Sequence, residues 1–138
     1  MLQTILLTGT GMWLGAMVFF AAVVAPTVFG TLEPLEAGKM IRRVFPKYYL
    51  FGLICLSLAV LASLATPNWV TVALAVLLAI ILYARQILMP KVNSARDAMR
   101  EKNEEHSPQF DRLHKLSVQL NAFEMLVCLG LMYVIATG

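Results

Sequence analysis

The chain has 138 residues, of which 59% are hydrophobic and only 14% are charged, and its formal net charge is +3. A soluble globular domain is about one-quarter charged, so this composition excludes an ordinary soluble domain and indicates a membrane protein. The basic residues are interspersed with acidic ones in the polar segments, and we therefore expect no nucleic-acid partner.

Three long runs of the sequence carry almost no charge. Residues 1–32 and 48–84 contain no charged side chain, and residues 116–138 contain only Glu124. One membrane-spanning helix needs about 20 apolar residues, so the middle run is long enough for two spans, and Pro67 and Asn68 mark a turn between them. The sequence predicts an all-α, polytopic four-helix bundle in one membrane domain, with spans at about 3–25, 48–65, 69–88 and 113–136.

The basic residues predict how this bundle is oriented. All of them lie at or between the facing ends of spans one and two or of spans three and four: Lys39, Arg42, Arg43 and Lys47, then Arg85, Lys91, Arg96, Arg100, Lys102, Arg112 and Lys115. Basic loops of membrane proteins stay in the cytoplasm. We therefore expect both basic loops inside, both termini outside, and a location in the bacterial inner membrane, with the lipid bilayer as the main partner.

Two polar segments connect these spans. Pro34 suits a first helical turn, and residues 34–46 place apolar side chains opposite basic ones, which predicts a short helix lying on the inner membrane surface. Residues 91–107 are mixed in charge and are expected to form a cytoplasmic connector. Ser107 is a suitable cap, and Pro108 a suitable first-turn residue, for the last helix.

The first span contains small residues at helical spacing. Gly11 and Gly15 stand four residues apart, a pattern that lets helix backbones approach closely in lipid, either within the bundle or in a dimer. Trp13 lies between them in the middle of the span, where its indole N–H needs a hydrogen-bond partner if it is buried.

The last span carries a stripe of polar side chains. At about 100° per residue, spacings of three, four, three and four residues place them on one face: His114, Ser117, Asn121, Glu124 and Cys128. Polar side chains inside a span face the bundle interior or a water-filled cavity. The sequence therefore predicts an inward-facing polar track with Glu124 near the middle of the membrane.

Three interpretations of Glu124 remain open at this stage. Arg85 lies within the apolar part of span three and is close enough in depth to form a buried ion pair with Glu124. A protonated or hydrated Glu124 would instead take part in moving a proton or another cation. Metal coordination, best suited to Cu(I), would use Cys55, Cys128 or His114, although none of these stands one helical turn from another.

No nucleophile triad, phosphate-binding loop or zinc protease motif is present, so we expect neither an enzyme nor a bound cofactor. The polar track predicts binding or movement of a small cation. The alternative is an accessory or assembly subunit of a larger membrane complex, docked through the glycine face and the connector. In either case we expect more than one copy, or a larger complex, to enclose a pathway.

Three separated motifs resemble the transmembrane protein 205-like family, a domain of unknown function in bacteria. They are AVVAPTVFGTL at 22–32, LEAGKMIRRVFPKYY at 35–49 and FDRLHKLSVQLN at 110–121. The resemblance implies a four-helix membrane protein and no established activity, and the association of the human relative with resistance to platinum drugs favours metal or drug handling. It marks as pattern positions Pro26, Phe29, Ala37, Gly38, Phe45, Phe110, His114, Ser117 and Asn121.

Overall fold

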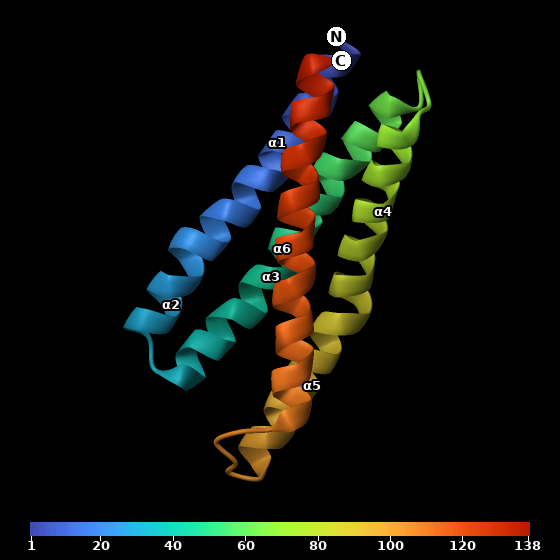
Figure 1. Ribbon diagram of the computed structural model, residues 1–138. Coiled ribbons are helices and arrows are strands. Elements are labelled where there is room, and N and C mark those ends of the chain that lie inside the picture. Colours follow the sequence, from blue (N-terminus) through green and yellow to red (C-terminus); the bar gives the residue numbers. More distant parts are fainter.

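The computed structural model describes all residues, 1–138, as an all-helical bundle (Figure 1). In chain order the elements are α1 (Leu2–Phe19), the π-helical turn η1 (Phe20–Val24), α2 (Ala25–Thr31), α3 (Pro34–Ser63), α4 (Trp69–Tyr83), the π-helical turn η2 (Ala84–Leu88), α5 (Met89–Glu101) and α6 (Pro108–Thr137). The first three elements form one continuous helix and α4, η2 and α5 form another. Four helices are thus long and apolar enough to cross a membrane, as the charge-free runs predict.

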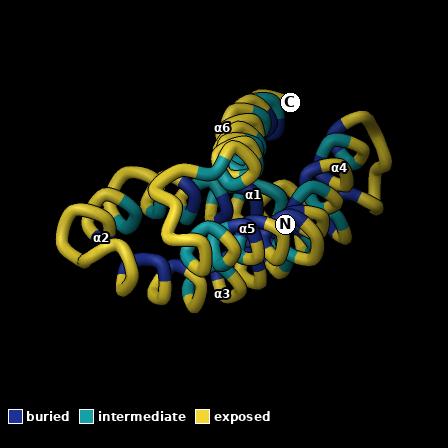
Figure 2. Tube along the Cα trace, turned by 90° about the horizontal axis from the view of Figure 1, so that it is seen from below, coloured by how far each residue is buried: buried dark blue, intermediate teal, exposed yellow.

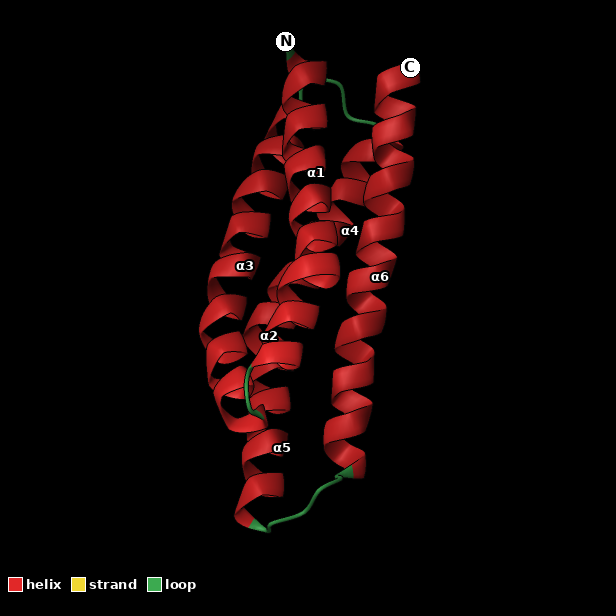
Figure 3. Cartoon of the chain, turned by 90° about the vertical axis from the view of Figure 1, so that its left-hand side faces the viewer, coloured by secondary structure: helices red, strands yellow, loops and turns green.

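The two ends of the bundle differ in what they contain. Both termini and the turn between α3 and α4 lie at one end, and the α2–α3 and α5–α6 connections lie at the other (Figures 1 and 3). The basic segments therefore share one end of the molecule. This arrangement agrees with four spans that alternate in direction.

Each π-helical turn stands just before a proline. η1 ends two residues before Pro26, and η2 ends two residues before Pro90. In both turns a backbone N–H reaches back five residues, from Ala25 to Phe20 and from Met89 to Ala84. Proline lacks an N–H and its ring crowds the carbonyl four residues earlier, and a widened turn relieves that conflict without ending the helix.

Helix α3 differs from the expected surface helix followed by a separate span. Residues 34–46 continue directly into the membrane-spanning part, with Pro46 inside one helix of 30 residues. Ala37 and Ile41 are buried in a small cluster with Val28 of α2. The apolar side of this segment therefore packs against a neighbouring helix.

The core lies along the centre of the bundle, and exposed positions line the outer sides of the helices (Figure 2). At two glycines α1 and α3 pack directly against each other. A Cβ atom at Gly9 would lie 2.6 Å from the Cys55 carbonyl oxygen, and one at Gly52 would lie 2.7 Å from the Trp13 ring. Of the two glycines expected to pack within the bundle or in a dimer, Gly11 faces the flexible end of Met132 on α6, whereas Gly15 is exposed and a Cβ atom there would have no neighbour within 4 Å.

The last helix begins as the sequence predicts. Pro108 occupies its first turn, and the Ser107 hydroxyl accepts a hydrogen bond from the Phe110 N–H at 3.5 Å. At the opposite end of the molecule, Asn68 caps α4 in the same way, through the Val70 N–H at 2.8 Å. These caps satisfy backbone donors that the first turn of a helix leaves unpaired.

Candidate functional site

The polar stripe on α6 becomes progressively more buried along the helix. His114 is exposed, Ser117 and Asn121 are half-buried, and Glu124 and Cys128 are 2% and 0% exposed. The Ser117 hydroxyl donates to the His114 carbonyl of its own helix at 2.7 Å. The stripe therefore runs from the surface near the basic end of the bundle to a buried carboxyl group.

One hydrogen bond ties the middle of the stripe to α3. The Tyr48 hydroxyl donates to the Asn121 side-chain oxygen at 2.7 Å, while the Asn121 amide contacts the Met125 sulfur at 3.6 Å. Glu124 is one turn further along α6 and lies near enough to Tyr48, Tyr49 and Cys128 to interact electrostatically with each. Glu124 is thus surrounded by uncharged groups.

Three buried polar atoms have no hydrogen-bond partner. They are the Thr10 hydroxyl and the Trp13 indole nitrogen on α1 and one carboxyl oxygen of Glu124 on α6. Trp13 is fully buried, with its ring 4.8 Å from that of Tyr48. Buried polar groups are nearly always paired, so such groups mark places where a proton, an ion or a ligand can act.

The anticipated ion pair between Arg85 and Glu124 is absent. The only inter-helix salt bridge joins Arg42 to Asp97, at 2.7 Å. Arg85 lies in the π-helical turn η2 and lines a small hollow with Arg42 and Gln86 beside α3. Arg85 and Glu124 were expected at similar depths in the membrane. Their side chains nevertheless do not meet, because Arg85 points toward α3 and not toward Glu124 on α6.

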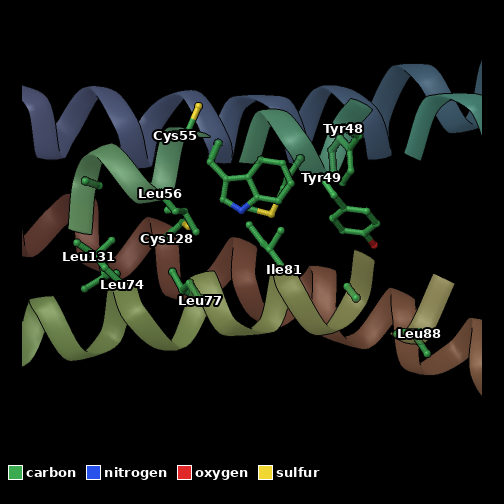
Figure 4. Close-up of a cluster of buried hydrophobic side chains, with 14 of the residues drawn as sticks. Tyr48, Tyr49, Cys55, Leu56, Leu74, Leu77, Ile81, Leu88, Cys128 and Leu131 are labelled. Atoms are coloured by element: carbon green, nitrogen blue, oxygen red, sulfur yellow. The ribbon is translucent and has the colours of Figure 1, made fainter. Parts of the chain in front are cut away.

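The cysteines do not form a disulfide. Cys55 and Cys128 are both buried with free thiols, and the Cys55 sulfur points toward α1 rather than toward Cys128 (Figure 4). His114 lies at the surface, where its ring stacks on the ring of Phe110. The three candidate metal ligands are therefore not brought together, and no three His, Cys, Asp or Glu side chains converge anywhere in the chain.

A cavity of about 290 Å³ lies beside the polar stripe. One wall is formed by η1 and α2, the opposite wall by α6, and the remainder by α3 and α5. Its polar lining consists of Tyr49, Asn93, Arg96, His114, Ser117 and Asn121. The cavity therefore follows the stripe from His114 to Asn121 and ends one helical turn before Glu124.

Arg96 and His114 lie at the mouth of this cavity. The Arg96 guanidinium lies 5.1 Å above the ring of Phe110, whose other neighbour is the His114 ring at 5.7 Å. Beyond the apolar part of the helices, the hydrogen bond from Arg42 lowers the pKa of Asp97 below its usual value. Arg96 is therefore the one Lys or Arg in the lining of this cavity, while Arg42, outside the lining, is paired with Asp97.

Five of the nine pattern positions of the family resemblance line the same cavity: Phe29, Phe45, His114, Ser117 and Asn121. Phe110 stacks between the side chains at its mouth, and Pro26 follows the π-helical turn in its wall. Gly38 lies against the guanidinium groups of Arg96 and Arg100, which would be 3.2 and 2.8 Å from a Cβ atom at this position.

Three polar residues of the cavity were not anticipated from the sequence as site residues. Tyr49 stands at the start of the expected second span, and Asn93 and Arg96 belong to the expected connector. Asn93 and Arg96 are three residues apart on α5 and therefore lie on one face of that helix, which could have indicated a shared site. Because the residues around them are charged, the segment was predicted to be a connector instead.

Comparison with known proteins assigns the chain to a family. Residues 8–101 match the model of a family described as a domain of unknown function, DUF4149. A protein of Aquifex aeolicus (strain VF5), named only as uncharacterized, is 29% identical over 119 residues, which are 86% of this chain and 84% of the relative. No solved structure matches. The narrower resemblance to transmembrane protein 205-like proteins stays a prediction, and α6 lies outside the matched residues. Because the family model covers more than half of the sequence, the protein belongs to the DUF4149 family.

Proposed function

We propose that this integral membrane protein binds a small cation, and most simply a proton, at Glu124. The observation that carries the proposal is a carboxyl group that is 2% exposed, has an oxygen without a hydrogen-bond partner and has no basic side chain within salt-bridge distance. An ionised carboxylate in such surroundings is costly. A proton or a bound cation removes that cost.

The cavity provides the route between this carboxyl group and the basic end of the bundle. His114, Ser117 and Asn121 line it in order of increasing depth. The hydrogen bond between Tyr48 and Asn121 stands between the end of the cavity and Glu124. We propose that this bond opens when Glu124 exchanges its proton. The positive-inside rule would place the mouth of the cavity in the cytoplasm of a bacterial cell, with the membrane in question being the inner membrane.

A proton suits Glu124 better than a metal ion does. Transition-metal sites in proteins assemble several His, Cys or carboxylate ligands. Around Glu124 the nearby groups are Tyr48, Tyr49, Asn121 and Cys128, and no group of three metal-binding residues forms. A proton needs only the carboxyl group itself and one exchange partner.

The test is proton movement into liposomes that contain the purified protein and a pH-sensitive dye. We expect flux in the wild type, and loss of flux to the level of empty vesicles in Glu124→Gln, which keeps the shape of the side chain but cannot exchange a proton. Gln119→Ala is the matched control, because Gln119 is exposed on the opposite face of the same helix. Equal flux in the wild type and in empty vesicles would remove the transport proposal, and copper flux that needs Glu124 would replace the proton with a metal ion.

A role as an accessory subunit remains the second candidate. It is favoured by the open space at Gly15, where a Cβ atom would meet no heavy atom within 4 Å although small residues in membrane helices commonly mark contacts. Purification in a mild detergent tests it. A partner protein that co-purifies with the wild type but not with Gly15→Leu would support this role. A wild-type protein that always purifies alone would contradict it.

A further inference from the structure

A second hollow, larger than the cavity on the polar stripe, opens on another side of the bundle. We name it the lateral groove. It has a volume of about 850 Å³ and lies between the α1–η1 helix and the first half of α3. Ala16, Phe19 and Val24 line one wall, and Met40, Val44 and Phe51 line the other. The groove touches neither Glu124 nor the rest of the α6 stripe.

A row of basic side chains follows one edge of this groove. Lys39, Arg43 and Lys47 are spaced four residues apart on α3, a row about 12 Å long at 1.5 Å per residue. Lys39 is neutralised by Glu36 at 2.7 Å. Arg43 and Lys47 are exposed and form no ion pair, so two positive charges beside the groove lack a partner.

The groove changes from polar to apolar along its length. Glu36 and Lys39 lie at the end near the α2–α3 connection, whereas Ala16 and Phe51 lie toward the middle of the bundle, since α1 and α3 run in opposite directions. Phe20 connects the two walls, because its ring packs against those of Phe45 and Tyr48, with ring centroids 5.2 and 5.0 Å apart. Phe19 and Phe51 are 59% and 38% exposed in the apolar part.

We propose that the lateral groove binds one anionic phospholipid of the leaflet that surrounds the basic end. The phosphate lies between Arg43 and Lys47, and an acyl chain lies along Phe19 and Phe51. Basic pockets between membrane helices are suited to anionic headgroups, and the bilayer itself supplies an amphiphile at this depth. A free phosphate ion would satisfy the charges but leave the exposed aromatic side chains uncovered. This site is independent of the function proposed for Glu124.

The experiment counts lipids bound to the purified, delipidated protein by native mass spectrometry during titration with phosphatidylglycerol or phosphatidylcholine. We expect Arg43→Gln/Lys47→Gln to weaken binding of phosphatidylglycerol by roughly tenfold to thirtyfold, because each basic side chain near the surface contributes on the order of 1 kcal/mol. Binding of phosphatidylcholine should change little. Arg112→Gln/Lys115→Gln is the matched control, since it removes the same charge from exposed positions at the start of α6.

Two further variants separate docking in the groove from general attraction to a basic surface. Met40→Trp and Ala16→Phe narrow the groove from opposite walls and leave every charge in place. Helix content and elution volume show whether each variant is folded. Each folded variant should no longer bind phosphatidylglycerol. The proposal is overturned if both charge pairs weaken binding equally, if the narrowed grooves bind as well as the wild type, or if inorganic phosphate displaces the lipid.

Discussion

At the scale of single residues, the contact between Trp13 and Gly52 holds α1 against α3. The ring of Trp13 occupies the space that a side chain at position 52 would need, 2.7 Å from where its Cβ atom would lie, and the indole is fully buried. Close packing of this kind is a main source of stability for helices in lipid, where the hydrophobic effect does not drive association. The same reasoning applies to Gly9 against the backbone of Cys55.

We expect Gly52→Ala to lower the free energy of unfolding by about 1–3 kcal/mol, because the added methyl group overpacks the contact with Trp13. Gly15→Ala is the control. It adds the same group where nothing lies within 4 Å, and alanine favours a helix by up to about 1 kcal/mol over glycine. Unfolding in detergent measures both. Equal effects at the two positions would contradict the packing described for Trp13.

A second prediction concerns the hydrogen bond between Tyr48 and Asn121. We expect Tyr48→Phe to lower the free energy of unfolding by about 0.5–1.5 kcal/mol, because the Asn121 oxygen loses its donor. In a double-mutant cycle with Asn121→Ala, the second change should cost less once the first is made. Additive effects would show that the two side chains do not interact.

Residue types and spacing predicted the stripe on α6, because a span of about 20 apolar residues leaves few ways to arrange five polar ones. They did not predict which glycine meets which helix. Gly9 faces α3 and Gly15 is exposed, and this difference depends on the rotation of α1 about its axis, which the local sequence does not determine. The predicted ion pair between Arg85 and Glu124 was wrong for the same reason, because the depth of a residue along its helix does not determine the direction in which its side chain points.

At the scale of elements, the prolines shape the helices without ending them. Pro26 and Pro90 each follow a π-helical turn, while Pro46 lies within α3 with no change of helix type. The sequence predicted a short helix over residues 34–46 with Pro34 in its first turn. It did not indicate that residues 34–46 remain part of α3, because that depends on contacts of Ala37 and Ile41 with a helix elsewhere in the chain.

We expect Pro90→Ala to raise the free energy of unfolding by about 1–3 kcal/mol, because an alanine restores a backbone donor inside a helix and removes the crowding that η2 relieves. Pro34→Ala is the control, since a proline in the first turn of α3 replaces an N–H that would be unpaired in any case. Unfolding of the two variants under identical conditions makes the comparison. No gain at position 90 would mean that tertiary packing, rather than the proline, maintains η2.

The ion pair between α3 and α5 gives a prediction with a defined pH dependence. The hydrogen bond from Arg42 lowers the pKa of Asp97, so the pair contributes its full stability above the ordinary carboxyl pKa of about 4. That contribution is lost as the pH falls through the lower, folded value. We expect Asp97→Asn to reduce stability at pH 7 by less than about 1 kcal/mol, because the pair is exposed. A deficit that persists unchanged in strong acid would contradict this assignment.

At the scale of the whole molecule, two helical hairpins have the same design. Each begins with a long helix that contains a π-helical turn followed by a proline, and each continues with a helix of 30 residues that has a proline in its first turn, Pro34 or Pro108. The number and alternation of the spans followed from charge-free runs and basic loops alone. The cavity did not, because it depends on how far α2 lies from α6.

The orientation of the bundle can be checked with single cysteines placed at its two ends, in a background without Cys55 and Cys128. We expect Thr66→Cys, in the turn between α3 and α4, to react with a membrane-impermeant maleimide added to whole cells. Glu104→Cys, in the α5–α6 connection, should react only after the membrane is opened. The reverse pattern would invert the topology and place the mouth of the polar cavity outside.

We propose that the buried carboxyl group of Glu124 exchanges a proton within the bundle. Infrared difference spectra of the protein in lipid bilayers, recorded between neutral and alkaline pH, observe this group directly. We expect a protonated carboxyl band that disappears at alkaline pH, that is absent from Glu124→Gln and that is retained in Gln119→Ala. A spectrum without such a band, or one that is the same in Glu124→Gln, would contradict it.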